Sequence, residues 1–378
     1  MRKGIYLCIL LIGLGSLEAA AQRNPVMTVL KENKATSVKD QARTGTCWSF
    51  STTSLVESED MRKGLGNYNL SEMFTVRKMY IEKAKNYLMR QGHAQFGQGG
   101  LGHDVIRAIG EYGAMPESAY TGLVKGTGQY DHTVLFNTLK SYLDSLLKHP
   151  PLPEHWLTGY KAILDRYMGK VPATFGFKGK TYTPRQFAEQ VMHFNPDDYL
   201  GLTSFTHHPF NTSFIIDIPD NYANGYYYNV PLKELITLVS GAVKKGYTVM
   251  WDTDVSNAGW QSGQGYALAL DSKPAGDTID PDRTEHGYDQ GYRQKLFDAL
   301  ITEDDHLMQI TGISKDKKGK EFFIVKNSWG TDSGPFGGYV YVSVPYFAIN
   351  TITVILPKAA LDQSMVTSIA GSGPKFYQ

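Results

Sequence analysis

The stretch Q-A-R-T-G-T-C-W-S-F, residues 41–50, gives the strongest indication of fold, because it holds one of only two cysteines among 378 residues. No proline or glycine occurs across residues 47–63, which predicts a helix that begins at Cys47. A thiol at a helix N-terminus lies where free backbone N–H groups and the helix dipole favour negative charge. Gly45 is expected to let the backbone turn sharply into this helix.

The other cysteine, Cys8, lies in an N-terminal segment that is typical of a secretory signal peptide. Two basic residues precede an apolar stretch that is too short to span a bilayer as a stable helix. Ala19-Ala20-Ala21 then provides small residues for cleavage. We therefore predict that residues 1–21 are a signal peptide, removed near Gln22, and that the mature chain is periplasmic or secreted.

The composition of the mature chain narrows the classes of protein to consider. Beyond residue 21 only one cysteine remains, so an internal disulfide is excluded, and a lone thiol in an oxidising compartment is expected to be buried or used. Basic and acidic residues are balanced, which gives no support for a nucleic-acid partner. No later run of about 18 apolar residues occurs, so no membrane contact is expected after cleavage.

Helical patterns dominate the first half of the chain, and strand patterns dominate the last third. Ser71 is placed to cap a second helix over residues 70–90. Residues 256–295 are polar and glycine-rich, which predicts a long loop. Residues 306–314 and 321–330 flank a lysine-glycine turn, which predicts a hairpin. This order of elements favours an α+β protein with two lobes.

The hairpin would bring Asn327 close to His306, which starts its first strand. An imidazole there can take the proton of Cys47 and activate the thiol as a nucleophile. The carbonyl of Asn327 can accept the other imidazole N–H and fix its tautomer, and Trp329 would shield that bond from water. The side-chain amide of Gln41, with the backbone N–H of Cys47, would stabilise an oxyanion.

Other histidines and acids are weaker candidates for chemistry. His103 is the rival base, but it is expected to face or cap a helix. His207 and His208 have no acidic or thiol partner at metal-binding spacing, so a structural role is favoured over metal binding. The thiol chemistry described above needs no metal and no organic cofactor. Asp304 and Asp305 either tune the neighbouring imidazole, attract the free amine of a substrate, or lie in a solvated loop, and these alternatives stay open.

Together these residues resemble the papain-like cysteine proteases. The matching features are Gln41, the G-x-C-W motif at residues 45–48, His306, and N-S-W-G at residues 327–330. Thr44 stands where papains usually have a further cysteine. The likeness is closer to the group of bleomycin hydrolase and bacterial aminopeptidase C, through segments such as L-S-E-M-F-T-V-R-K-M-Y, Y-G-A-M-P-E and A-V-K-K-G-Y-T-V-M-W-D-T-D-V.

The resemblance implies a papain-like fold, with a helical left lobe carrying Cys47 and a β-rich right lobe carrying the histidine and asparagine. It implies one peptidase domain over residues 22–378, with an inserted, mostly helical region at about 120–225. Gly99 and Gly100 match the glycine pair of the substrate groove, where an extended peptide backbone approaches closely. Trp329 is expected to contact substrate as well.

The function implied is that of a cysteine peptidase acting on peptide substrates through a thioester, with an aminopeptidase as the first choice. In this group the C-terminal tail restricts the cleft to the N-terminal residues of peptides, but the ending S-I-A-G-S-G-P-K-F-Y-Q differs from the usual tail. An endopeptidase and a non-hydrolytic peptide-binding relative therefore stay open. A homo-oligomer is a further implication, and the short segment between residue 21 and Cys47 is expected to hold no inhibitory prodomain.

Overall fold

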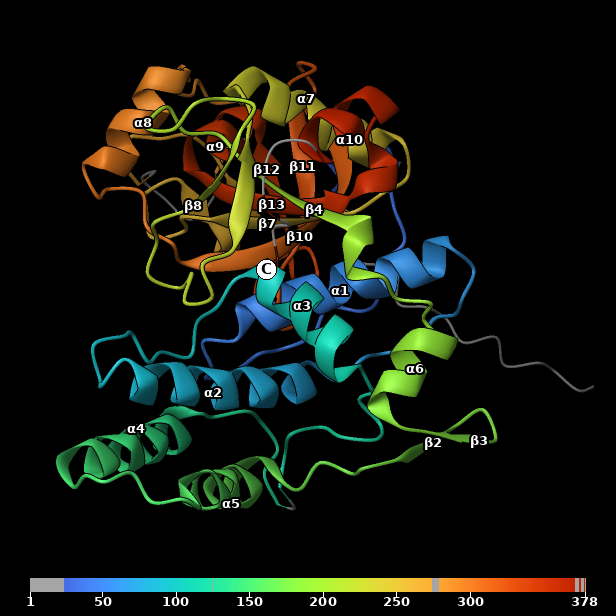
Figure 1. The fold of residues 1–378 in the computed structure, drawn as a ribbon. Coiled ribbons are helices and arrows are strands. Elements are labelled where there is room, and N and C mark those ends of the chain that lie inside the picture. The colour runs from blue at the N-terminus through green and yellow to red at the C-terminus, as the bar shows by residue number, and fades with distance from the viewer. Residues whose placement is uncertain (1–23, 125, 274–278, 371–373, 375–376, 378) are drawn as a thin grey trace, which may run out of the picture.

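The structure, a computed structural model, describes residues 24–370 except 125 and 274–278, together with Pro374 and Tyr377. Figure 1 shows two lobes, with helices α1 to α6 in the lower one and a large sheet with α7 to α10 in the upper one. The predicted signal peptide, including Cys8, lies outside the described residues. No helix in the described part of the chain is both long and apolar enough to cross a membrane.

The elements follow the order helices first, strands later. The helices are α1 (Cys47–Arg62), α2 (Glu72–Met89), α3 (Gly102–Tyr112), α4 (Thr133–Lys148), α5 (Trp156–Met168), α6 (Pro184–Gln190), α7 (Leu232–Lys244), α8 (Gln290–Asp298), α9 (Val344–Asn350) and α10 (Gln363–Ala370). The strands are β1 (Thr28–Glu32), β2 (Phe175–Phe177), β3 (Lys180–Tyr182), β4 (Tyr199–Thr203), β5 (Ser213–Ile215), β6 (Tyr226–Asn229), β7 (Val249–Thr253), β8 (Trp260–Gln261), β9 (Tyr266–Ala267), β10 (His306–Lys315), β11 (Glu321–Lys326), β12 (Tyr339–Ser343) and β13 (Thr351–Pro357).

One mixed sheet organises the upper lobe. Its strand order is β5-β6-β4-β13-β7-β10-β11-β12-β9-β8, and β1 pairs with β10 outside this path. Strand β10 lies between β7 and β11 and runs antiparallel to both, with His306 opposite Thr253 at its start. The predicted hairpin of β10 and β11 is confirmed, and Lys315 pairs with Glu321 at its turn.

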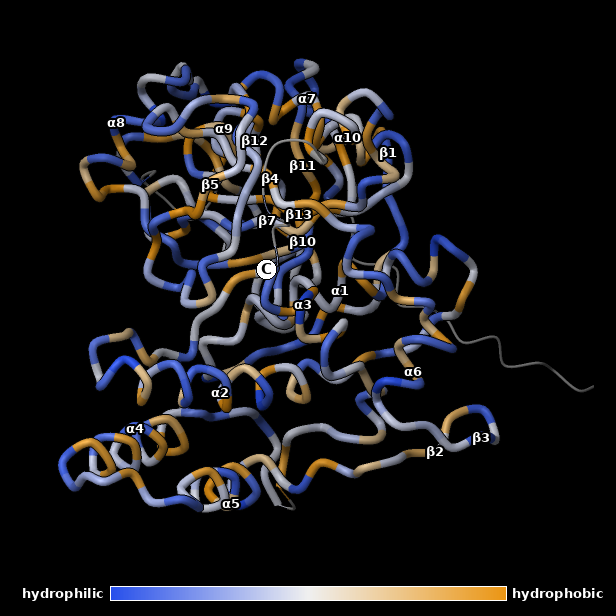
Figure 2. Tube along the Cα trace, in the orientation of Figure 1, coloured by the Kyte–Doolittle hydropathy of each residue, from blue (hydrophilic) through white to orange (hydrophobic). Residues whose placement is uncertain are grey.

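Burial of apolar side chains explains both lobes. In the upper lobe, Val239 and Val243 of α7 and Phe347 of α9 pack against Trp251 of the sheet. In the lower lobe, α4 turns its leucines inward at a spacing of four residues, from Leu135 through 139 to 143, while polar residues face outward. Figure 2 shows this alternation of hydrophobic and hydrophilic positions around α4 and α5.

Helix α1 crosses β10, and the contact between them is polar. Gln309 of β10 accepts a hydrogen bond from Ser54 Oγ (2.7 Å) and donates from Nε2 to Ser58 Oγ (2.8 Å). Lys326 Nζ donates to Ser54 Oγ at 2.6 Å and to Thr36 Oγ1 at 3.1 Å. A cavity of about 20 Å³ lies among these side chains, which is room for about one water molecule. These bonds fix the helix that begins at the cysteine onto the strand that begins at the histidine.

Some predicted elements are present in the structure, and others differ from the prediction. Ser71 caps α2 as predicted, since its Oγ accepts from Phe74 N at 3.1 Å. The predicted loop of residues 256–295 is only partly correct, because β8 and β9 lie within it and helix α8 begins inside it and continues past its end. Asp289 caps the polar sequence of α8 and accepts from Tyr292 N at 2.7 Å. The region at about 120–225 contains α4, α5 and α6 together with strands β2 to β5.

Candidate active site

Cys47 is the first residue of α1 and is 7% exposed. Behind it, Trp48 is fully buried and donates from Nε1 to the backbone oxygen of Gln98 at 3.0 Å. Gly45 does not have the left-handed backbone that a sharp turn at this glycine would use. It instead admits Gln98, whose Oε1 accepts from Gly45 N at 2.9 Å and whose Cβ would lie 3.1 Å from an added Cβ.

His306 and Asn327 form the pair predicted from the hairpin. His306 Nε2 lies 2.7 Å from Asn327 Oδ1, and both side chains are buried. Asn327 directly follows β11, and its backbone N–H donates to Gly338 O at 3.1 Å, which holds the residue in place. The Trp329 ring stacks on the imidazole, with centroids 4.5 Å apart and planes inclined by 27°, so it covers this bond as expected.

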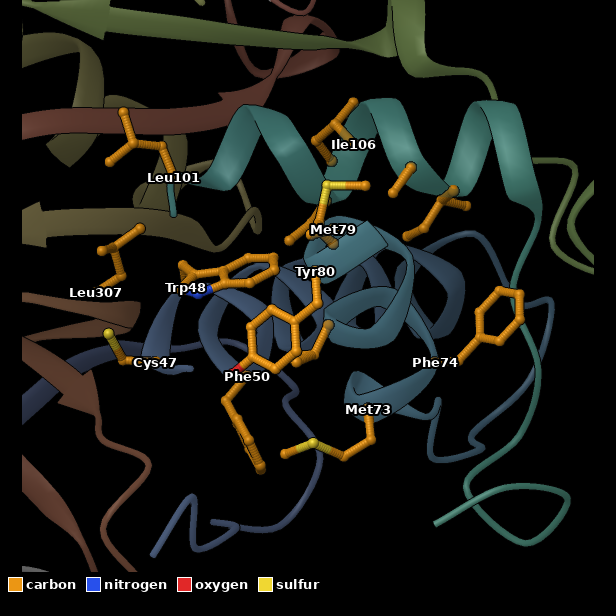
Figure 3. Close-up of a cluster of buried hydrophobic side chains, with 14 of the residues drawn as sticks. Cys47, Trp48, Phe50, Met73, Phe74, Met79, Tyr80, Leu101, Ile106 and Leu307 are labelled. Carbon is orange, nitrogen blue, oxygen red and sulfur yellow. The ribbon is translucent and has the colours of Figure 1, made fainter. Parts of the chain in front are cut away.

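Cys47 is brought to the same strand end. The backbone N–H of Leu307, the residue after His306, approaches the Cys47 sulfur and favours its thiolate. Figure 3 shows Cys47 and Leu307 together at the margin of the buried cluster, with Trp48 and Leu101 beside them. The fold therefore gathers residues 47 and 306 from opposite lobes.

Burial of Cys47 and His306 favours the neutral form of each side chain. Burial raises the pKa of Cys47 to about 12, and the carboxyl groups of Asp220, Asp252 and Asp304 add to this effect against the opposing Leu307 N–H. Burial also lowers the pKa of His306 to about 4, although the Asn327 bond favours its protonated form. Burial therefore favours the neutral thiol and the neutral imidazole over a charged pair at this site.

Gln41 lies in the loop before α1, which pairs with the segment after Asn327. Its backbone N–H donates to Ser328 O at 2.9 Å, and its Oε1 accepts from Ser328 Oγ at 2.7 Å. One side-chain N–H donates to Thr44 O at 2.8 Å, which leaves the second amide proton for an oxyanion. Thr44, which replaces the usual cysteine, donates to Gln41 O at 2.8 Å and so steadies the same loop.

Gly99 and Gly100 lie in the loop before α3, beside Trp48. A Cβ at Gly100 would lie 3.2 Å from the Trp48 ring. A Cβ at Gly99 would overlap the carboxyl group of Asp220, which comes from the loop between β5 and β6. Lys83 of α2 donates to the carbonyl oxygen of Gly99 and fixes this loop from below. The Asp220 carboxyl group therefore covers Gly99, and the sequence did not predict this contact.

Three of the weaker candidates, His103, His207 and Asp305, have structural partners. His103 Nδ1 lies 3.0 Å from the Tyr227 hydroxyl in the interior. His207 stacks on Phe297 and hydrogen bonds Gln294. Asp305 accepts from two backbone N–H groups, at residues 255 and 256, so it shapes a loop.

Two family models match the chain: "Peptidase C1-like family" over residues 176–373 and "Papain family cysteine protease" over residues 26–122. Aminopeptidase W of Lactobacillus delbrueckii subsp. lactis is 25% identical over 91% of this chain and 87% of its own length. Aminopeptidase G of the same organism is 22% identical, over 80% and 77%. Cysteine proteinase 1, mitochondrial, of Saccharomyces cerevisiae is 22% identical, over 84% and 74%.

The solved structures agree with this relationship at the level of fold. The crystal structure of PepW from Lactobacillus rhamnosis matches with a TM-score of 0.73 at 19% identity, covering 93% of this chain and 87% of that one. The expected papain-like α+β fold and the resemblance drawn from the sequence are therefore confirmed.

Proposed function

Because the chain belongs to the Peptidase C1-like family, whose model matches just over half of it, we propose that this cysteine peptidase is an aminopeptidase acting through Cys47, His306 and Asn327. The observation that carries the proposal is the 2.7 Å bond from His306 to Asn327 under Trp329, one residue from the Leu307 N–H that meets the thiol. The names of the related aminopeptidases support the choice of an exopeptidase.

Acylation follows from this geometry. Because His306 Nε2 is held by Asn327 Oδ1, its Nδ1 is the nitrogen free to accept the proton of Cys47 as the sulfur attacks the scissile carbonyl carbon. The oxyanion that forms is stabilised by the backbone N–H of Cys47 and the second N–H of Gln41. The imidazolium then protonates the leaving amine, and the C–N bond breaks to leave a thioester on Cys47.

Deacylation uses the same groups in reverse. His306 takes a proton from water as the water oxygen attacks the thioester carbon, and the same two donors stabilise the second oxyanion. The proton returns to the Cys47 sulfur as the carbon–sulfur bond breaks, which releases the amino acid. Because burial favours the neutral thiol and the neutral imidazole, proton transfer from Cys47 to His306 is expected to accompany attack by the sulfur.

The direct test compares peptides with a free and an acetylated N-terminus. An aminopeptidase should cleave the free peptide and lose nearly all activity on the acetylated one, because a blocked amine cannot enter a groove that Asp220 covers at Gly99. Product analysis by mass spectrometry should show single residues released stepwise from the N-terminus. Equal cleavage of both peptides at internal bonds would make the protein an endopeptidase instead.

We also propose that the peptidase works outside the cytoplasm. The proposal is supported by the charged start, short apolar stretch and alanine triplet of residues 1–21. N-terminal sequencing of protein from its native host should give a mature chain that starts near Gln22, in the periplasmic or secreted fraction. Recovery of an intact chain from the cytoplasm would contradict the proposal.

A further inference from the structure

Three carboxyl groups from distant parts of the chain lie around the substrate side of Cys47. Asp252 belongs to β7, Asp304 lies two residues before His306, and Asp220 belongs to the loop between β5 and β6. All three act electrostatically on the Cys47 thiol, and Asp252 and Asp304 also contact one another through their carboxyl groups. Peptide hydrolysis as derived above uses none of them.

The charge of these carboxyl groups is only partly balanced, because Lys83 acts electrostatically on Asp220 and Asp304 without forming an ion pair with either. None of the three forms a salt bridge within the described part of the chain. The nearest ammonium group, that of Lys83, is engaged by the carbonyl oxygens of Gly97 and Gly99. Buried negative charge without a partner is strongly unfavourable in a folded protein. Burial of these carboxyl groups is therefore electrostatically unfavourable, and a bound cation would stabilise them.

Individual oxygen atoms define where such a cation would bind. Asp252 is fully buried, and although its Oδ2 accepts from Thr353 Oγ1 at 3.1 Å, its Oδ1 has no hydrogen-bond donor. Both carboxyl oxygens of Asp304 are buried, and neither accepts a hydrogen bond of normal geometry, although the backbone N–H of Asp220 lies close enough to favour the ionised form. Burial, together with the neighbouring carboxyl groups, raises the pKa of Asp304 to about 7 and that of Asp252 well above its usual value. Burial of these two carboxyl groups beside one another therefore favours a pair that keeps one proton between them.

Asp220 also blocks the groove sterically beside Gly99. Its carboxyl group occupies the space next to Gly99 where a side chain would begin, and Gln95 Nε2 lies 3.4 Å from its Oδ1. A peptide that pairs with the glycine loop in extended form therefore meets Asp220 and must end there. For the proposed aminopeptidase, the peptide end that is held beside the scissile bond is the N-terminus, which carries a positive charge.

We propose that the α-ammonium group of the substrate binds between Asp220 and the Asp252–Asp304 pair, so that these side chains select the free N-terminus. The inference rests on the proposed aminopeptidase function and assigns its specificity. An ammonium group offers three N–H donors, which matches the unpaired oxygens, and its charge replaces the shared proton. On this assignment the free N-terminus is selected by the side chains of Asp220, Asp252 and Asp304.

The test varies the charge on each side of this contact. The substrates are an aminoacyl fluorogenic amide and its analogue with a hydroxyl group in place of the α-amine. Wild-type protein should prefer the amine by about 30-fold or more in kcat/KM, as expected for a buried charge pair. In Asp220→Asn this preference should fall toward one, chiefly through KM for the amine. Asp217→Asn, an exposed change in the same loop, is the matched control and should keep the wild-type preference.

Two further measurements separate the outcomes. The rate of Cys47 alkylation by iodoacetamide should stay within a few-fold of wild type in Asp220→Asn, which shows that the reaction centre is intact. Asp304→Asn, the second variant, should also lower the preference for the amine. If both variants keep the wild-type preference, the assignment of the ammonium site is wrong while the aminopeptidase stands. If wild-type protein cleaves acetylated and free peptides equally, the proposed function fails, and the ammonium site fails with it.

Discussion

The Cys47→Ala variant should lose at least about 10⁴-fold in kcat/KM on a free aminoacyl substrate, because no other group in the site can form the thioester. Cys47 is buried at the start of α1 beside the Leu307 N–H, so a water molecule has little space to take the place of the sulfur in the variant. Steady-state kinetics with a fluorogenic amide measures the loss. Mass spectrometry after treatment with iodoacetamide should place the single adduct of the native wild-type protein on residue 47.

The Gln41→Ala variant should lose less activity than the Cys47→Ala variant. Gln41→Ala removes one of two oxyanion donors and keeps the nucleophile, so it should lose about 10²- to 10³-fold in kcat. The ranking follows from geometry, since Gln41 is held by Thr44 and Ser328 beside the helix start. Substantial peptidase activity in Cys47→Ala, or an adduct on another side chain, would remove Cys47 from the mechanism.

The His306→Ala variant should lose about 10³- to 10⁶-fold in kcat, because the thiol would have no base to take its proton. Residues that act as a unit are not additive, so the double variant with Cys47→Ala should be no slower than the slower single variant. His149→Ala, an exposed histidine after α4, is the matched control and should retain wild-type turnover. A double variant that is slower by the product of both losses would contradict a shared step.

The pH dependence of alkylation tests the protonation state directly. Because the pKa of Cys47 is raised to about 12 and that of His306 is lowered to about 4, the thiolate fraction at neutral pH is small in the empty site. The alkylation rate of wild-type protein should therefore keep rising with pH between about 5 and 9, since only the thiolate reacts. A plateau beginning near pH 4 would indicate a preformed thiolate–imidazolium pair and would contradict the neutral resting site.

The parts that the sequence predicted are those coded by local signals. The helix start at Cys47, the Ser71 cap and the β10–β11 hairpin each depend on neighbours along the chain, and the structure has all three. The bond between His306 and Asn327 follows from that hairpin, because antiparallel pairing returns the second strand to the beginning of the first. The roles of these residues in catalysis remain predictions for the variants above.

The parts that the sequence did not predict depend on contacts between distant segments. Asp220, Asp252 and Asp304 carry no shared spacing, and only strand pairing and the loop after β5 bring them to one place. Gly45 suggests a turn because glycine permits unusual backbone angles, but its neighbour Gln98, 53 residues away, explains it by close approach. Helix α8 escapes prediction because its polar sequence lacks a clear apolar stripe.

Lys326 has a consequence for how the two halves of the enzyme stay aligned. It directly precedes Asn327, and its ammonium group is bonded to Ser54 on the helix that Cys47 begins. Burial lowers the pKa of Lys326 to about 8, so its ammonium group is positively charged for most of the time at neutral pH. Asn327, whose side chain is bonded to His306, is therefore connected through the buried Lys326 to the helix that begins at Cys47, which helps to fix the position of His306 relative to the sulfur.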